Sequence, residues 1–221
     1  MTENIILSPI VISLFTLIIS GFFVFFGGIF VAFVVGKIKS PRIRNLTDAL
    51  ITLGMVLPPT VMGFFLLVIF GPDSLPGKFF FRIFGFNPAF SAVAPIITAF
   101  FAAFPLMYRS LRAGFSQVDS CLIDAARVVG ETETGILWKI IVPTCKNSVI
   151  AGISLAMMRA LGEYGATAMF AGNIIGKTRT LPLAVYSAVM SGDFKVAGIY
   201  VLVILSFALI STLLVGRESY K

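Results

Sequence analysis

The sequence predicts an all-α protein that crosses a membrane about five times. Of its 221 residues, 58% are hydrophobic and only 12% are charged, and the mean hydropathy is +1.01. A soluble domain of this length has too small an interior to bury so much apolar surface. Five stretches of the chain are apolar over the roughly 20 residues that a helix needs to cross a bilayer. The fold class is therefore a multi-spanning helical membrane protein, with a single transmembrane domain over residues 1–221.

The five apolar stretches are the predicted membrane spans. The first and the fourth are longer than a straight crossing requires, so they have room to tilt or to protrude. Spans two and four contain helix-interrupting residues: Pro58, Pro59, Gly63, Gly162 and Gly165. Such breaks are tolerated where backbone lines a cavity and also where helices pack closely, and both readings stay open here. The predicted spans are residues 9–36, 46–70, 90–107, 142–170 and 197–215.

The distribution of Lys and Arg predicts the orientation. With the N-terminus outside and the C-terminus in the cytoplasm, eleven basic residues fall inside and five outside, while Arg159 lies within the fourth span. This asymmetry follows the positive-inside rule and accounts for most of the net charge of +7, so no nucleic-acid partner is needed. The inner set is Lys37, Lys39, Arg42, Arg44, Arg109, Arg112, Arg127, Lys139, Lys146, Arg217 and Lys221; the outer set is Lys78, Arg82, Lys177, Arg179 and Lys195.

Two outer connections contain apolar segments that are too short to cross a bilayer. Within residues 71–89, Phe79, Phe80 and Phe81 predict an interfacial helix. Within residues 171–195, the segment 180–186 predicts a re-entrant or interfacial helix with Pro182 in its first turn, where a proline is tolerated.

The residue types argue against an enzyme. The chain has no His, which removes the commonest general base and metal ligand. No span contains clustered carboxylates or a nucleophile next to a base. Cys121 and Cys145 lack the spacing of a zinc site, and we interpret both as structural or incidental. We expect no catalytic residue, no metal and no cofactor in this chain, while an ATP-independent channel or carrier stays open as an alternative function.

The longest inner connection, residues 113–141, predicts a helix, a glycine and a second helix. The first helix runs from Ser120 to Val129, which contain neither Gly nor Pro, with Asp119 or Ser120 as its cap. Gly130 ends it, and residues 136–138 begin the second helix. We call residues 120–141 the elbow.

The elbow has a shape that suits a groove on a soluble partner. Ala125 and Ala126 leave room for another backbone to approach, and the second helix returns to the membrane at Pro143. A solvated loop with no partner is the alternative interpretation.

The elbow carries a motif that resembles the Glu-Ala-Ala signature of ABC importer permease subunits, Glu-Ala-Ala-x3-Gly-x9-Ile-x-Leu-Pro. Here Asp124 replaces Glu and Val142 replaces Leu, and neither change alters the charge or polarity of the position. The resemblance implies that these residues couple the membrane domain to an ATPase: Asp124, Ala125, Ala126, Gly130, Ile140 and Pro143.

A second block resembles the molybdate branch of the same family. Members show Gly-Glu-Phe-Gly-Ala-Thr followed by Asn-Ile-x-Gly-x-Thr-Arg-Thr-x-Pro, and residues 162–167 and 173–182 match this pattern. Residues 57–63 and 104–107 match as well. The segment 172–178 is one residue short of a phosphate-binding loop and lies outside in the predicted topology, so it is not read as an ATP site.

The resemblance implies a transporter built from several subunits. This chain is then one half of a homodimeric pore that docks two cytoplasmic ATPase subunits inside and an anion-loaded binding protein outside. The pore imports an oxyanion by alternating access, and the second motif favours molybdate. ATP is then used by the partner subunit. A sulfate or tungstate permease is the alternative within the family, because these anions are similar dianions.

Charged residues at membrane depth are the remaining candidates. Arg159 and Glu163 lie four residues apart on the fourth span, so we expect them to pair on one helix face. Together with Gly165 they are candidates for the translocation path or gate, and a structural ion pair is the alternative. Lys177 and Arg179 in the outer loop are candidates for contact with the anion or the binding protein, and ordinary solvated charge is the alternative.

Overall fold

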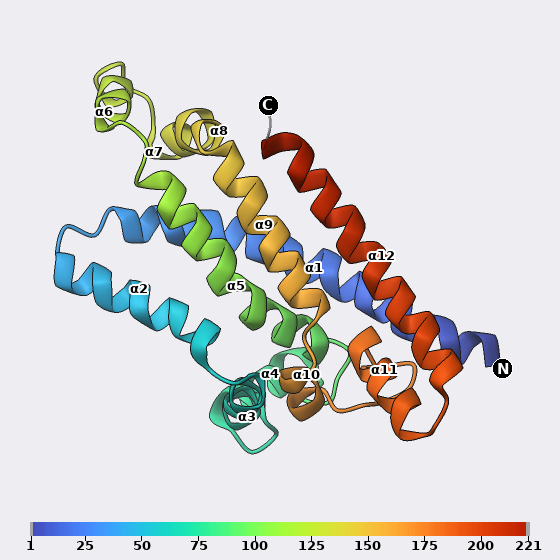
Figure 1. Cartoon of the computed structure of the whole chain (residues 1–221). Coiled ribbons are helices and arrows are strands. Elements are labelled where there is room, and N and C mark those ends of the chain that lie inside the picture. Colours follow the sequence, from blue (N-terminus) through green and yellow to red (C-terminus); the bar gives the residue numbers. More distant parts are fainter. Residues whose placement is uncertain (1, 220–221) are drawn as a thin grey trace.

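The computed structural model describes the backbone of residues 2–219 and the side chains of residues 6–213, and this part of the chain contains helices and no strand. The helices lie alongside one another in a bundle whose two ends carry the shorter elements (Figure 1). They are α1 (Thr2–Gly36), α2 (Pro41–Val56), α3 (Pro59–Phe70), α4 (Leu75–Phe84), α5 (Ala94–Phe115), α6 (Ser120–Val128), α7 (Glu133–Ile136), the π-helix η1 (Leu137–Ile141), α8 (Val142–Thr144), α9 (Lys146–Leu161), α10 (Gly165–Phe170), α11 (Leu181–Met190) and α12 (Phe194–Ser219).

The core of the bundle lies where α1, α5 and α9 pack together. Met107 of α5 is fully buried there. A Cβ atom on Gly28 of α1 would lie 2.8 Å from Met107 Cγ, and one on Gly152 of α9 would lie 3.0 Å from Met107 Sδ. These two glycines therefore let three helix backbones approach one side chain, which is the packing that membrane helices favour because lipid offers no hydrophobic drive between them.

The second predicted span is not one straight helix. α2 and α3 meet at an angle of 114°, so the predicted span over residues 46–70 is a broken span or a re-entrant loop. The cause is the Pro58-Pro59 pair, because a residue that precedes proline is pushed out of the helical region. Leu57 has ψ 133° and Pro58 has ψ 137°, both extended, and the helix restarts at Pro59.

The fourth predicted span, residues 142–170, is also interrupted. It consists of α8, α9 and α10, and the segment from Glu133 to Thr144 is bent by 83° against α9. α9 ends at Leu161, and Tyr164 departs from helical geometry with φ −122° and ψ −53° before α10 begins. The interruption that the sequence predicts near Gly162 and Gly165 is therefore present in this range.

The two helix breaks pack against each other. A Cβ atom on Gly63 of α3 would lie 2.8 Å from the Cα of Ala166 in α10, and one on Gly165 would lie 2.9 Å from Pro59 Cβ. Of the two readings left open for these glycines, close helix packing is the one that the structure supports for Gly63 and Gly165. The hydroxyls of Thr98 and Thr167 share a hydrogen bond of 2.9 Å that joins α5 to α10.

The two short apolar segments form helices, as the sequence predicts. Ser74 caps α4 by accepting a hydrogen bond of 2.9 Å from the Gly77 N–H, and Gly85 ends it with φ 74°. α11 carries Pro182 within its first two positions. α3, α4, α10 and α11 lie together at the end of the bundle opposite to α6 and α7 (Figure 1).

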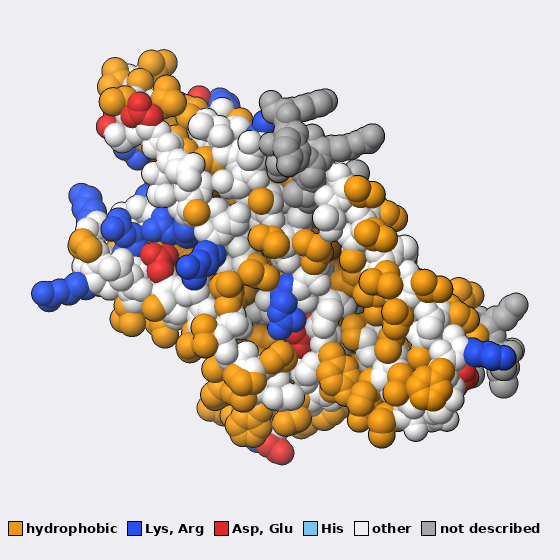
Figure 2. Space-filling view, in the orientation of Figure 1, with side chains coloured by type: hydrophobic (Ala, Val, Ile, Leu, Met, Phe, Trp, Pro, Cys, Tyr) orange, Lys and Arg blue, Asp and Glu red, His pale blue; other side chains and the backbone are white. Residues whose placement is uncertain are grey.

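Length and composition allow three to five membrane crossings in the described chain. Residues Ile6–Gly36, Ala94–Phe115 and Phe194–Leu213 are helices long and apolar enough to cross alone, and each of the two bent pairs adds one if it is counted as a span. Hydrophobic side chains are spread over much of the visible surface, whereas many of the Lys and Arg side chains gather near the junction of α1 and α2 (Figure 2).

The two cysteines give a test of this fold. Cys121 is exposed on α6, whereas Cys145 is buried and donates a hydrogen bond of 3.1 Å to the Gly114 carbonyl. We expect a membrane-impermeant thiol reagent to label Cys121 in inverted vesicles and to leave Cys145 unlabelled until the protein is denatured. Mass spectrometry of the labelled peptides measures both. Labelling of Cys121 in sealed right-side-out cells would contradict the predicted orientation.

Candidate functional site

The first arm of the elbow is α6, which forms as the sequence predicts. The Asp119 carboxylate caps it by accepting a hydrogen bond of 2.9 Å from the Cys121 N–H. Gly130 follows with φ +87°, the left-handed conformation that commonly ends a helix and that glycine adopts without steric penalty. Asp124, Ala125 and Ala126 therefore lie on a helix that is fixed at both ends by local interactions.

The second arm begins three residues earlier than the sequence predicts. Thr132 caps α7 by accepting a hydrogen bond of 3.1 Å from the Gly135 N–H, so the helix starts at Glu133 rather than at Ile136. The chain continues as the π-helix η1, and the side chains of Ile136, Leu137 and Ile141 are buried in the main core. The second arm is thus anchored in the bundle, and Ile140 and Pro143 lie on it or directly after it, in η1 and α8.

The first arm has no such anchor. Among the described residues of α6 none is buried, and only Ile123 and Ala126 pack partly against the core. Leu122 is 51% exposed, and the two valines that end the helix, Val128 and Val129, are 87% and 86% exposed. An exposed helix with alanines and apolar side chains is a surface that a soluble partner can cover.

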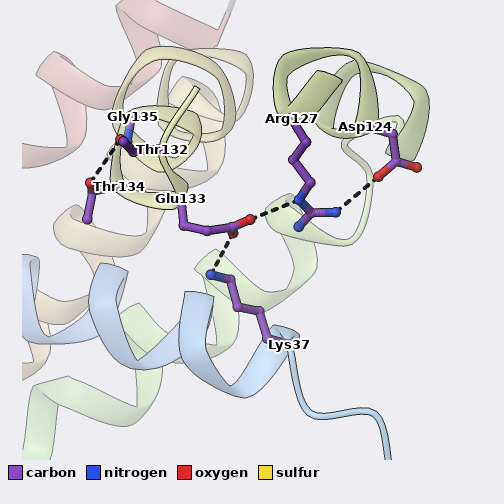
Figure 3. Close-up of polar contacts among 7 residues, drawn as sticks. All are labelled: Lys37, Asp124, Arg127, Thr132, Glu133, Thr134 and Gly135. Carbon is purple, nitrogen blue, oxygen red and sulfur yellow. Dashed lines mark hydrogen bonds and ion pairs between the residues drawn. The ribbon is translucent and has the colours of Figure 1, made fainter. Parts of the chain in front are cut away.

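Ion pairs hold the two arms together. Glu133 accepts from Arg127 Nε at 2.8 Å and pairs with Lys37 Nζ at 2.6 Å, and Arg127 also pairs with Asp124 at 3.0 Å (Figure 3). The hydrogen bonds from Arg127 and Lys37 lower the pKa of Glu133 to about 2, so its carboxylate is charged at neutral pH.

A cavity of about 600 Å³ lies beneath the elbow. Its walls come from the ends of α1, α2 and α5 and from both arms of the elbow, and they include Lys37, Arg44 and Glu133. Asp48 and Arg112 also line this cavity, and they belong to a second polar cluster: Asp48 of α2 accepts hydrogen bonds from the Tyr108 hydroxyl and, at 3.2 Å, from Arg112 Nε.

This second cluster is a feature that our sequence analysis missed. The signal was available, because Asp48 is an acidic residue inside the predicted span 46–70, and ionisable residues at such positions have partners. Its effect is to join α2 to α5 at the elbow end of the bundle.

The predicted pair of Arg159 and Glu163 is present, but not on one helix face. α9 ends at Leu161, so Glu163 lies beyond the helix and folds back to bond Arg159. The other carboxylate oxygen of Glu163 accepts a hydrogen bond of 2.8 Å from the Ala166 N–H at the start of α10. Glu163 is 2% exposed, whereas the Arg159 side chain is 32% exposed. One buried carboxylate therefore connects both sides of the helix break.

Gly165 and the two outer-loop cations lie at the end opposite to the elbow. Gly165 opens α10 and packs on Pro59. Lys177 is exposed in the loop before α11, and Arg179 Nε donates a hydrogen bond of 2.7 Å to Asn173 Oδ1. The structure thus does not bring these cations together with the elbow residues.

Fold and site together define the class of protein as a helical membrane component with an exposed helical arm, and comparisons with known proteins give its family. The family model for the "Binding-protein-dependent transport system inner membrane component" matches residues 25–217. The putative molybdenum transport system permease protein YvgM of Bacillus subtilis is 44% identical over 160 residues, 72% of this chain and 70% of that protein. The molybdenum transport system permease protein ModB of Escherichia coli K12 is 36% identical over 188 residues, 85% and 82% of the two chains.

Solved structures agree on the fold. The permease chain in a structure of inward-facing conformations of the MetNI methionine ABC transporter has a TM-score of 0.74 at 16% identity, and the match covers 98% of this chain and 95% of that chain. The chain described here belongs to the family of binding-protein-dependent transport system inner membrane components, and it is a multi-pass protein of the cytoplasmic membrane. The family predicted from the elbow motif is confirmed.

The conformation of Gly130 makes a first prediction for the elbow. A Cβ atom at this position would meet nothing within 4 Å, so a substitution acts through backbone strain alone. We expect Gly130→Val to cost about 1–2 kcal/mol locally and to lower ATP-driven uptake while membrane insertion is retained. Gly130→Asn is the matched control, because Asn tolerates the left-handed region. Uptake by vesicles and co-purification with the ATPase measure the effect, and normal uptake by the valine variant would contradict it.

The buried carboxylate makes a second prediction. Arg159→Gln leaves the Glu163 charge unpaired, and Glu163→Gln keeps an acceptor for the Ala166 N–H but leaves Arg159 without its counter-ion. Removing one partner of a buried pair typically costs about 3–5 kcal/mol. We expect each single variant to lower the unfolding temperature of the purified protein and the double variant to recover part of the loss. Effects that simply add in the double-mutant cycle would show that the two residues are not coupled.

Proposed function

We propose that this chain is the permease subunit of an ATP-driven importer for molybdate or a closely similar tetrahedral oxyanion. Family membership and the molybdenum permeases among its relatives support the class and the substrate. The observation that carries the proposal is the elbow, because it presents an exposed, motif-bearing helix on an arm that is anchored in the bundle. The chain itself supplies no chemistry, and ATP is used by a separate subunit.

The elbow is the docking site for the ATPase subunit. Ala125 and Ala126 permit close backbone approach, and the exposed Leu122, Val128 and Val129 offer apolar area for burial on a partner. Because the ATPase works on ATP in the cytoplasm, the elbow lies on the cytoplasmic side, the C-terminus is cytoplasmic and the N-terminus is outside. The excess of Lys and Arg near the α1–α2 junction supports this orientation.

The two interrupted helices line the translocation path. Discontinuous helices are a recurring feature of transporter substrate sites. Arg159 is partly exposed at the α9–α10 break and is neutralised by Glu163, which keeps a dianion route free of uncompensated negative charge. Gly165 permits the close contact between α10 and α3 on which the geometry of both breaks depends.

A second copy of the chain completes the pore. Among the described residues of α2 none is buried, although Leu46, Leu50 and Leu53 are apolar. An apolar face on a helix that also bears the Asp48 cluster fits a homodimer, because a second α2 covers it without exposing Asp48 to lipid. At the opposite end, Lys177 and Arg179 attract the anion or contact the binding protein that delivers it.

Transport by the assembled system tests the proposal. We expect proteoliposomes that contain the permease, its ATPase and its binding protein to accumulate radiolabelled molybdate only when ATP is present on the side of the membrane that carries the ATPase. Tungstate and sulfate are measured as competitors, and stronger inhibition by sulfate than by unlabelled molybdate would reassign the substrate. Uptake by the permease alone, without ATP, would show an independent channel or carrier instead.

A further inference from the structure

We propose that Glu133, by binding Lys37, is a positioning residue that couples the movement of the elbow to α1. This inference rests on the proposed function, because it concerns how movement of a docked ATPase reaches the membrane helices. Neither residue belongs to the signature motif. Glu133 lies between the two matched parts of that motif, and Lys37 lies at the far end of the first span.

The contacts form one continuous chain from the docking helix to α1. Asp124 and Arg127 belong to α6, Glu133 opens α7, and Lys37 directly follows α1 (Figure 3). The Glu133 carboxylate uses one oxygen for Arg127 at 2.8 Å and the other for Lys37 at 2.6 Å. Lys37 Nζ also lies 3.9 Å from the centroid of the Phe33 ring, which limits the positions that the ammonium group can take.

The weak apolar anchoring of α6 makes these ion pairs important. None of its described residues is buried and only Ile123 and Ala126 pack partly against the core, so packing transmits a displacement of α6 to the bundle only weakly. The second arm is different, since Ile136, Leu137 and Ile141 are buried in the core that includes α1, and the rings of Trp138 and Phe26 lie 6.1 Å apart. Glu133 lies at the start of this anchored arm and ties both α6 and the end of α1 to it.

The energetic scale suits a reversible link. Lys37 and Glu133 are 42% and 45% exposed at their side chains, and exposed pairs of this kind are weak and screened by salt. Such a pair does not determine whether the protein folds. It determines how closely α1 follows the elbow, which is a property that transport efficiency reports and that expression level does not.

The elbow also contains a matched control. Glu131 and Lys139 form an ion pair of 2.9 Å within the same segment. Glu131 precedes α7 and Lys139 belongs to η1, so this pair does not reach α1. Loss of this pair removes a salt bridge of the same chemical type from the elbow and leaves the Lys37–Glu133 contact intact.

The first experiment measures molybdate uptake per ATP hydrolysed by the complete reconstituted transporter. We expect Lys37→Met and Glu133→Gln each to lower this ratio about fivefold, the factor that corresponds to about 1 kcal/mol at 25 °C, with ATPase co-purification unchanged. The double variant is expected to be no worse than either single variant, and Lys37→Arg to keep the wild-type ratio. Lys139→Met is expected to keep it as well.

The second experiment needs no transport. Amide hydrogen exchange of residues 120–129 is measured on the purified permease, because exchange reports local opening. We expect about fivefold faster exchange in Lys37→Met and in Glu133→Gln, and wild-type exchange in Lys139→Met.

The two measurements separate the link from the proposed function. If wild-type transporter moves molybdate but the variants change neither the uptake ratio nor the exchange, the link is wrong and the function stands. The link is equally wrong if Lys139→Met has the same effect, or if the two single effects multiply in the double variant. If the wild type moves no oxyanion while the exchange pattern is as expected, the link stands and the proposed function is wrong.

Discussion

Inside a bilayer every backbone N–H and C=O group has to find a partner within the protein, and this requirement governs both helix breaks in the chain. The α2–α3 break is caused by two prolines; each lacks a backbone N–H, so these positions add no unpaired donor to the break. The α9–α10 break has no proline and frees backbone groups between Leu161 and Gly165. Glu163 answers this need by accepting from the Ala166 N–H, and its own charge is then balanced by Arg159. Close packing of Gly63 on Ala166 and of Gly165 on Pro59 holds the two breaks against each other.

The same physical rule explains why a charged pair occurs in an otherwise apolar segment. An ion pair in the membrane is expensive, and a hydrophobic residue in place of each partner would often be no less stable. The pair is useful here because one carboxylate both caps α10 and holds α9. A neutral side chain such as Gln supplies the acceptor but not the counter-charge for Arg159. The pair thus has a structural role that is separate from any contact with the anion, and both roles can be present in one group.

The sequence predicts local features well and long-range geometry poorly. The capped α6, the left-handed Gly130 and the helices α4 and α11 follow from residue types within a few positions. The hydropathy of residues 46–70 and 142–170 gives no sign of bends of 114° and 83°, because an average over a window is insensitive to backbone direction. The contact of Lys37 with Glu133 joins positions far apart in the chain, and no local pattern indicates which acid a given lysine will meet.

The residues whose contacts the sequence did not predict have their partners on other helices. Asp48 was visible as an acid in an apolar run, but its partners Tyr108 and Arg112 are known only once α2 and α5 lie side by side. Where the partner lies on another helix, sequence reasoning therefore finds the group that needs a partner and not the partner itself.

The Arg159–Glu163 pair and the Lys37–Glu133–Arg127 network differ in burial, and this difference suits different tasks. The Glu163 carboxylate is nearly inaccessible to water, so its pairing is little screened by salt and holds the α9–α10 break in one geometry. The Lys37–Glu133–Arg127 network is exposed on all its members, so its pairs can separate and re-form at little energetic cost. A transporter that alternates between two states needs a fixed unit that moves and an adjustable connection to the device that moves it. The buried Arg159–Glu163 pair suits the fixed unit, and the exposed Lys37–Glu133–Arg127 network suits the adjustable connection.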